Sequence, residues 1–127
     1  MSIVKLPVSI GELWDKYTIL LIKKEKVIDQ DKIKHILNEI DYFSTIINDY
    51  PYENNKMFID LKLVNSELWD IEDKIRIKEK KKEFDDEFIN LARQVYHKND
   101  ERATIKSNIN VEYKSQIHEV KEYVNYE

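Results

Sequence analysis

Two Glu-x-x-Asp motifs are the clearest candidates for chemistry in this sequence. Glu12 and Asp15 form the first motif, Glu67 and Asp70 form the second, and Asp73 follows the second three residues later. Carboxylates three residues apart lie on one face of a helix. If the two faces converge, their oxygens suit Mg²⁺ or Mn²⁺, which bind carboxylates together with water and substrate phosphates. The motifs therefore support an alternative prediction, a Mg²⁺-dependent hydrolase of a nucleotide or related phosphate compound.

A second group of candidates interrupts the apolar stripes of two predicted helices. Glu25 lies on the stripe of the first helix, whereas Asn99, Arg102 and Lys106 lie on the stripe of the fourth. A buried charge needs a partner, so we expect Glu25 to pair with Arg102 or Lys106. The whole predicted polar network consists of Glu25, Asp73, Arg93, Asn99, Arg102 and Lys106.

This network has two interpretations. As a structural layer, it fixes how the helices align with one another. As a site, its guanidinium and ammonium groups bind a small anionic ligand, in a pocket where the layer opens at one end of the bundle. In the hydrolase alternative, Arg102 and Lys106 hold the phosphate while the Glu-x-x-Asp carboxylates hold the metal.

Residue counts and spacings exclude several common sites. The single Gly rules out a glycine-rich phosphate loop, and the lack of Cys rules out disulfides, thiolate metal sites and cysteine nucleophiles. His35, His97 and His118 are not spaced three or four residues apart, which disfavours zinc and di-iron sites. The basic run 78–83 is diluted by acids in a protein of net charge −4, so we expect no nucleic-acid binding. No cofactor is expected outside the hydrolase alternative.

The elements that must position these residues are helices. The chain has 127 residues with only 1 Gly and 2 Pro, too few for the turns of an all-β fold. Apolar residues recur every three or four positions over 9–28, 31–49, 54–82 and 85–110, which predicts four helices. Similar spacing over 111–127 predicts a short C-terminal helix or a tail. The sequence contains no signal peptide and no run of about 18 uncharged apolar residues. We therefore expect a cytoplasmic protein without a membrane segment.

Trp14 and Trp69 each stand in a Glu-Leu-Trp-Asp run, and an offset of 55 residues superimposes the two runs. Both tryptophans lie on apolar stripes and are expected to be packing anchors. The offset predicts duplicated hairpins at about 9–50 and 54–110, each with an apolar face that it cannot bury alone. We therefore predict one all-α domain over residues 1–127. Its fold is an antiparallel four-helix bundle of two duplicated helical hairpins, with a short C-terminal helix or tail.

Three fragments of the chain resemble those of a known family. They are Val8–Lys16, Leu68–Arg76, and Leu91–Tyr96 with the following Asn99–Ala103 and Ile105–Lys106. Over nearly its whole length the chain resembles an uncharacterised family of small helical bacterial and phage proteins, a domain of unknown function. The resemblance implies no reaction, cofactor or substrate. It implies only that a site would lie in these fragments.

The function that we expect from these patterns is a small non-enzymatic binding or protein-interaction module with a polar pocket in the bundle. Its partner is expected to be an unidentified protein or a small anionic ligand. The wide, Ile-rich stripes of the first and third helices also favour a homodimer, because such stripes exceed what one small core covers.

Overall fold

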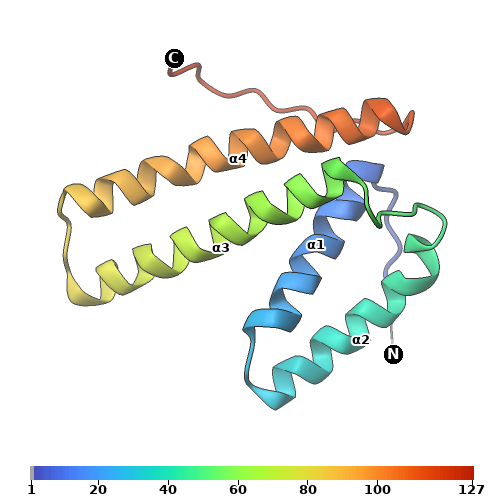
Figure 1. The fold of residues 1–127 in the computed structure, drawn as a ribbon, viewed down its shortest axis with the longest axis horizontal. Helices are drawn as coiled ribbons and strands as arrows, with labels where there is room; N and C mark the ends of the chain where they lie inside the picture. Colours follow the sequence, from blue (N-terminus) through green and yellow to red (C-terminus); the bar gives the residue numbers. More distant parts are fainter. Residues whose placement is uncertain (1) are drawn as a thin grey trace.

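The computed structural model describes residues 2–127, which contain four α-helices (Figure 1). The helices are α1 (Ile10–Lys26), α2 (Gln30–Ile47), α3 (Lys56–Lys81) and α4 (Asp86–Glu112). No strand occurs in this part of the chain. The predicted all-α fold is therefore confirmed, and the helix bounds lie within a few residues of the predicted ones.

Side chains at the start of each helix explain where it begins. An N-cap side chain accepts a hydrogen bond from a backbone N–H of the first turn, a donor that has no partner within the helix. Ser9, Asp29, Asn55 and Asp85 have this role for α1, α2, α3 and α4. Helix α3 ends at Lys81, and the next residue, Lys82, has a left-handed backbone with φ 56°. Local chemistry therefore sets these helix ends.

The four helices form two antiparallel hairpins that pack together through α1 (Figure 1). Helices α3 and α4 make the most extensive contact and form the longer hairpin. Helix α1 contacts all three other helices, whereas α2, among the described helices, contacts α1 alone. The result is a four-helix bundle in which the α1–α2 hairpin diverges from the α3–α4 hairpin. Side chains of α1 can therefore meet both α3 and α4.

Trp14 of α1 lies in the main hydrophobic core. Its side chain is fully buried, its ring lies edge-on to Phe58 and Tyr113, and its indole N–H donates to the backbone carbonyl of Tyr50 at 3.2 Å. The prediction that Trp14 is a packing anchor is therefore confirmed. Trp69 is only partly buried, so the two tryptophans have different environments. The duplication of the hairpins stays a prediction.

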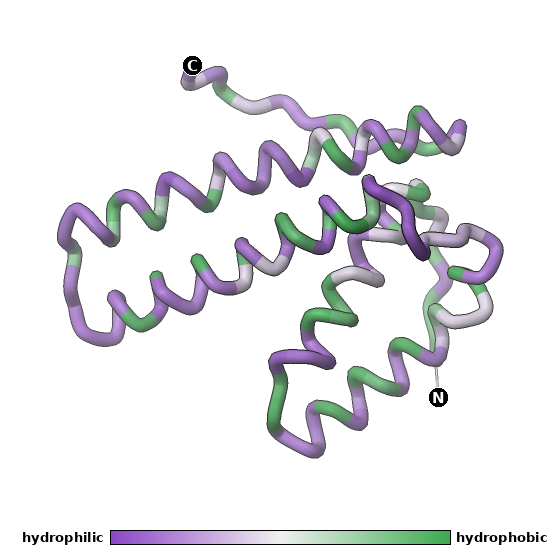
Figure 2. The backbone as a smooth tube through the Cα atoms, viewed as in Figure 1, coloured by the Kyte–Doolittle hydropathy of each residue, from purple (hydrophilic) through white to green (hydrophobic). Residues whose placement is uncertain are grey.

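The distribution of hydropathy follows this packing. Figure 2 shows hydrophobic residues recurring along α1, α2 and the beginning of α3, and mainly hydrophilic residues at the turn between α3 and α4. The core therefore lies where the two hairpins meet, and the far end of the α3–α4 hairpin extends into solvent. None of the helices within residues 2–127 is long and apolar enough to cross a membrane.

Gly11, the single glycine of the sequence, allows α1 to approach α4 closely. Its backbone N–H donates to the side-chain oxygen of Asn110 at 2.6 Å. A Cβ atom at this position would lie 2.5 Å from the backbone carbonyl oxygen of Lys106, a distance that real Cβ atoms essentially never show. The close approach places Glu12 and Asp15, in the first turns of α1, against the second half of α4.

The residues after α4 form an extended tail. A left-handed residue, Lys114 with φ 52°, follows the end of α4, and the chain then runs back along that helix (Figure 1). The hydroxyl of Ser115 accepts a hydrogen bond from the N–H of Ile10 at 3.3 Å, which ties the start of the tail to the start of α1. Of the two predicted outcomes, a short helix or a tail, the structure has the tail.

Candidate functional site

Asp15 joins three helices in a buried polar cluster. Its side chain is only 1% exposed although it carries a carboxylate. Arg102 of α4 donates to this carboxylate through Nε at 2.9 Å and also through Nη2. Asn65 of α3 donates to it at 2.9 Å. The hydrogen bond to Asp15 raises the pKa of Arg102. Asp15 and Arg102 stabilise each other, because removing either one would leave the other as an unpaired charge in a buried environment.

Lys106 supplies the second cation of the cluster. Its side chain is 10% exposed, and its Nζ donates to Glu12 at 2.6 Å and to Glu119 at 3.0 Å. The carboxylate of Asp15 lies farther away, at 3.8 Å. Burial lowers the pKa of Lys106, but the hydrogen bonds to Glu12 and Glu119 outweigh burial and leave the pKa above its usual value. Lys106 therefore stays positively charged.

Glu119 belongs to the tail and lies between two lysines. Its carboxylate forms an ion pair with Lys121 at 2.9 Å and accepts a hydrogen bond from Lys106 at 3.0 Å. The contact with Lys121, which has the larger effect, and the contact with Lys106 lower the pKa of Glu119 to about 2. Nearer its end, the tail makes a second attachment to α4, where the hydroxyl of Tyr126 donates to the carboxylate of Asp100.

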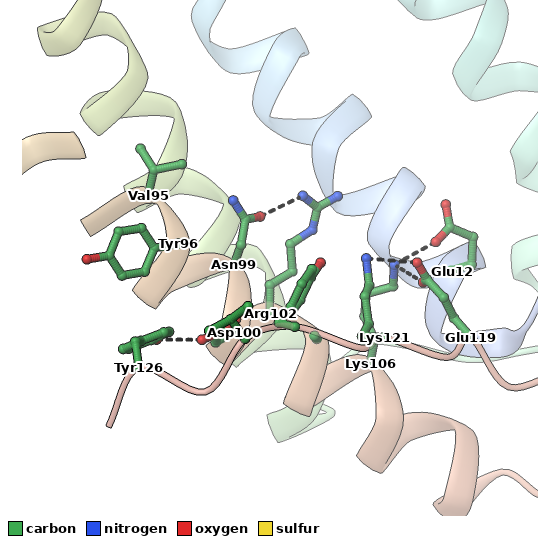
Figure 3. A pocket seen from close by; sticks show the side chains of 13 residues that line it. Glu12, Val95, Tyr96, Asn99, Asp100, Arg102, Lys106, Glu119, Lys121 and Tyr126 are labelled. Carbon is green, nitrogen blue, oxygen red and sulfur yellow. Dashed lines mark hydrogen bonds and ion pairs between the residues drawn. The ribbon is translucent and has the colours of Figure 1, made fainter. Parts of the chain in front are cut away.

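A cavity of about 610 Å³ lies between α4 and the tail (Figure 3). We call it the tail pocket. Its lining consists of Glu12 from α1, Val95, Tyr96, Asn99, Asp100, Arg102, Ala103 and Lys106 from α4, and Glu119, Lys121, Tyr123, Val124 and Tyr126 from the tail. Lys106 and Lys121 converge on Glu119 at one end, whereas Tyr96 and Tyr126 lie at the other end with ring centres 5.0 Å apart. The pocket therefore combines a charged end with an aromatic end.

Arg102 keeps free donor capacity beside the tail pocket. A guanidinium has five N–H bonds. Its Nε and Nη2 bind Asp15, and its Nη1 donates to the side-chain oxygen of Asn99 at 3.3 Å. Two N–H bonds of Arg102 therefore have no hydrogen-bond acceptor among residues 2–127. The side-chain amide nitrogen of Asn99 also donates to no acceptor in this part of the chain. An anion in the pocket can accept hydrogen bonds from these groups without breaking the pair with Asp15.

The structure brings together part of the predicted polar network. Asn99, Arg102 and Lys106 lie in one cluster. Glu25 lies outside it, because this residue is in the last turn of α1, where it is exposed and pairs with Lys62 of α3 at 2.7 Å. The prediction that Glu25 points inward and pairs with Arg102 or Lys106 is therefore wrong. The other two predicted members are exposed on the α3–α4 hairpin: Asp73 and Arg93.

The two Glu-x-x-Asp motifs do not converge. The first motif binds cations of α4, as described above. In the second, Glu67 pairs with Lys98 at 2.6 Å and Asp70 pairs with Lys26 at 3.4 Å, while Asp73 is exposed. Within residues 2–127, no group of three or more His, Asp or Glu side chains is arranged to hold a metal ion. The convergence that a shared magnesium site requires is therefore not observed.

The cluster also contains side chains that were not predicted as network residues from the sequence, among them Asp15, Asn65 and Glu119. A signal for Asp15 exists, because Asp15, Thr18 and Ile22 have the spacing of one helical stripe and all three are buried. Asn65 likewise interrupts the buried stripe of α3. No spacing pattern indicates Glu119, since the path of an extended tail does not follow from helical periodicity.

Comparisons with known proteins agree with the resemblance seen in the sequence, at the level of an uncharacterised family. No curated protein and no solved structure matches the chain. A family model described as a family of unknown function, DUF6165, matches residues 4–126. Since this match spans nearly all of the 127 residues, the chain belongs to the DUF6165 family of unknown function.

Proposed function

We propose that the protein is a non-catalytic binding module and that the tail pocket is its ligand site. The observation that carries this proposal is Lys106, a cation that is 10% exposed and that lies in the wall of a cavity of about 610 Å³. Pockets for small molecules commonly have volumes of about 300–1,000 Å³ and combine apolar walls with a few placed polar groups. The tyrosines and the free N–H groups of Arg102 provide that combination.

Binding rather than catalysis is supported by the protonation of the groups around the pocket. A general acid or base works best when its pKa lies near the working pH. Here the pKa of Lys106 and the pKa of Arg102 are raised, and the pKa of Glu119 is lowered to about 2. These groups keep their charges near neutral pH. They are suited to holding a charged ligand and poorly suited to transferring a proton.

The proposal is tested by thermal unfolding of the purified protein with nucleotides, sugar phosphates and dicarboxylates, each with and without Mg²⁺. A ligand at 100 times its Kd adds about 2.7 kcal/mol of stability, which raises the Tm by several degrees for a chain of this size. We expect at least one compound to raise the Tm without Mg²⁺. No shift with any compound contradicts the proposal, and a shift that requires Mg²⁺ favours the hydrolase alternative.

Two lysine variants locate the binding site. Lys121→Gln removes an exposed ammonium of the tail pocket, and we expect it to reduce the ligand-induced shift in Tm. Lys62→Gln is the matched control, because Lys62 also pairs with one glutamate but does not line the pocket. Equal shifts for both variants would place the ligand elsewhere on the protein.

A further inference from the structure

Unused hydrogen-bond donors gather at the charged end of the tail pocket. Two N–H bonds of Arg102 and the side-chain amide nitrogen of Asn99 have no acceptor among residues 2–127. The ammonium of Lys121 has three N–H bonds, and its described ion-pair partner is Glu119 at 2.9 Å. The side chain of Lys121 is 40% exposed, so its ammonium is accessible to a ligand. These donors suit an oxyanion, because hydrogen bonds between charged groups are stronger than those between neutral groups.

The ion-paired cluster at the charged end has one positive charge in excess. Within residues 2–127 it joins four cations to three carboxylates: Lys16, Arg102, Lys106 and Lys121 to Glu12, Asp15 and Glu119. Lys16 belongs to it through Glu12, at 3.4 Å. Asp100 adds a negative charge only at the aromatic end, where it accepts a hydrogen bond from Tyr126 (Figure 3). An anionic group can therefore be added at the charged end while Glu119 stays in place, and one phosphate is favoured over three.

Two tyrosines at the other end of the tail pocket have free surface for the ring of a ligand. Tyr96 of α4 and Tyr126 of the tail lie edge to face, with ring centres 5.0 Å apart. In spite of this contact, the two residues are 42% and 44% exposed. Every nucleobase can stack on an aromatic side chain, because every base has a π face. The exposed surface of the two tyrosines therefore suits a nucleobase.

The two ends of the pocket are too far apart for one small ion to contact both. Tyr96 and Arg102 are six residues apart on α4, which corresponds to about 9 Å along the helix axis at roughly 1.5 Å per residue. Both residues line the cavity of about 610 Å³. An elongated molecule with a ring at one end and an oxyanion at the other can contact both ends. A nucleoside monophosphate has this form, because its ribose separates the base from the phosphate.

We propose that the tail pocket binds a nucleoside monophosphate, whose phosphate lies at the charged end and whose base lies at the aromatic end. The inference rests on the proposed ligand site and adds the class of ligand. The phosphate accepts hydrogen bonds from Arg102, Asn99 and Lys121, and the base contacts Tyr96 and Tyr126. The tail stays against α4 when the ligand binds, because Lys121 and Tyr126 belong to the tail and form one wall of the site.

The first test compares matched probes on the wild-type full chain. Isothermal titration calorimetry in EDTA measures the Kd of the four ribonucleoside 5′-monophosphates, apart from any effect of Mg²⁺. For the monophosphate that binds most tightly, the nucleoside lacks the phosphate, ribose 5-phosphate lacks the base, and the triphosphate carries more negative charge. We expect at least one monophosphate to bind, and the nucleoside and ribose 5-phosphate to bind at least about tenfold more weakly. The triphosphate should also bind more weakly than the monophosphate.

The second test locates the base. Tyr96→Leu removes the ring, whereas Tyr96→Phe keeps it. Tyr42→Leu is the matched control, because Tyr42 is a 52% exposed tyrosine of α2 that does not line the pocket. We expect Tyr96→Leu to raise the Kd of the monophosphate by about fivefold or more, since it loses the stacking of the base. Tyr96→Phe and Tyr42→Leu should bind as the wild type does. The first test uses only the wild type, so it decides the inference even if Tyr96→Leu does not fold.

The outcomes separate this inference from the proposed function. If any of the three matched probes binds as tightly as the monophosphate, or if Tyr96→Leu binds as the wild type does, the nucleoside monophosphate is overturned while the proposed binding function stands. If no monophosphate binds but a dicarboxylate raises the Tm, the inference is again overturned alone. If no compound of either experiment binds, both proposals are overturned. Tight binding of a monophosphate that is weakened only in Tyr96→Leu supports both.

Discussion

Replacing Arg102 with alanine removes the main partner of a carboxylate that is 1% exposed. Asp15 would lose its two hydrogen bonds from the guanidinium and keep one from Asn65 at 2.9 Å. The ammonium of Lys106, at 3.8 Å, would be its nearest remaining cation. Removing one partner of a buried ion pair costs about 3–5 kcal/mol. Because Asn65 and Lys106 remain, we expect Arg102→Ala to lower the free energy of unfolding by about 3 kcal/mol.

Urea denaturation measures this loss, provided that the m-value is the same for the variant and the wild type. Lys98→Ala is the control, because it breaks a less buried pair with Glu67, and such pairs contribute about 0–1 kcal/mol. The double variant Asp15→Ala, Arg102→Ala should lose less stability than the sum of the single variants, since each single variant leaves the other group unpaired. A loss below about 1 kcal/mol for Arg102→Ala, or additive losses in the double variant, would refute a structural role for this pair.

Three further predictions test other parts of the structure. Gly11→Ala should lower the free energy of unfolding by about 1–3 kcal/mol in the same denaturation assay, because the alanine Cβ would overlap the backbone carbonyl of Lys106 and force α1 away from α4. An unchanged free energy of unfolding would contradict the close approach of the two helices. Carbon-13 NMR should give Glu119 a pKa near 2, so its ion pairs contribute fully to stability above pH 4.5 and this contribution is lost as the pH falls through 2. A pKa near 4.5 would show that the contacts with Lys106 and Lys121 do not form in solution. The accessible surface of 9506 Å² exceeds the roughly 7,200 Å² of a compact monomer of this mass, and among the described helices α2 packs on α1 alone. We therefore expect a homodimer, for which light scattering should give a mass of about twice 15.4 kDa. A mass of 15.4 kDa at all concentrations would exclude the homodimer.

The helices and their approximate ends were predictable because they depend on residues close together in the chain. Ser9, Asn55 and Asp85 cap helices where the sequence predicted starts, and apolar residues at steps of three and four predicted all four helices. The same periodicity identified Arg102 and Lys106 as polar groups on a helix face that meets other helices. The spacing of apolar residues along a helix predicts its buried face, and the polar residues that lie on this face can then be read from the sequence.

The partners of those polar groups were decided by the tertiary structure alone. Arg102 pairs with Asp15 and not with Glu25, because the close approach at Gly11 brings the first turns of α1, and not its last turn, against α4. The position of Glu119 depends on the path of a tail that has no periodic pattern. Four amphipathic helices and a polar face on the fourth follow from the order of the residues alone, since these are properties of neighbouring residues. Crossing angles, close approaches and the path of the tail involve residues far apart in the chain, and they created the tail pocket.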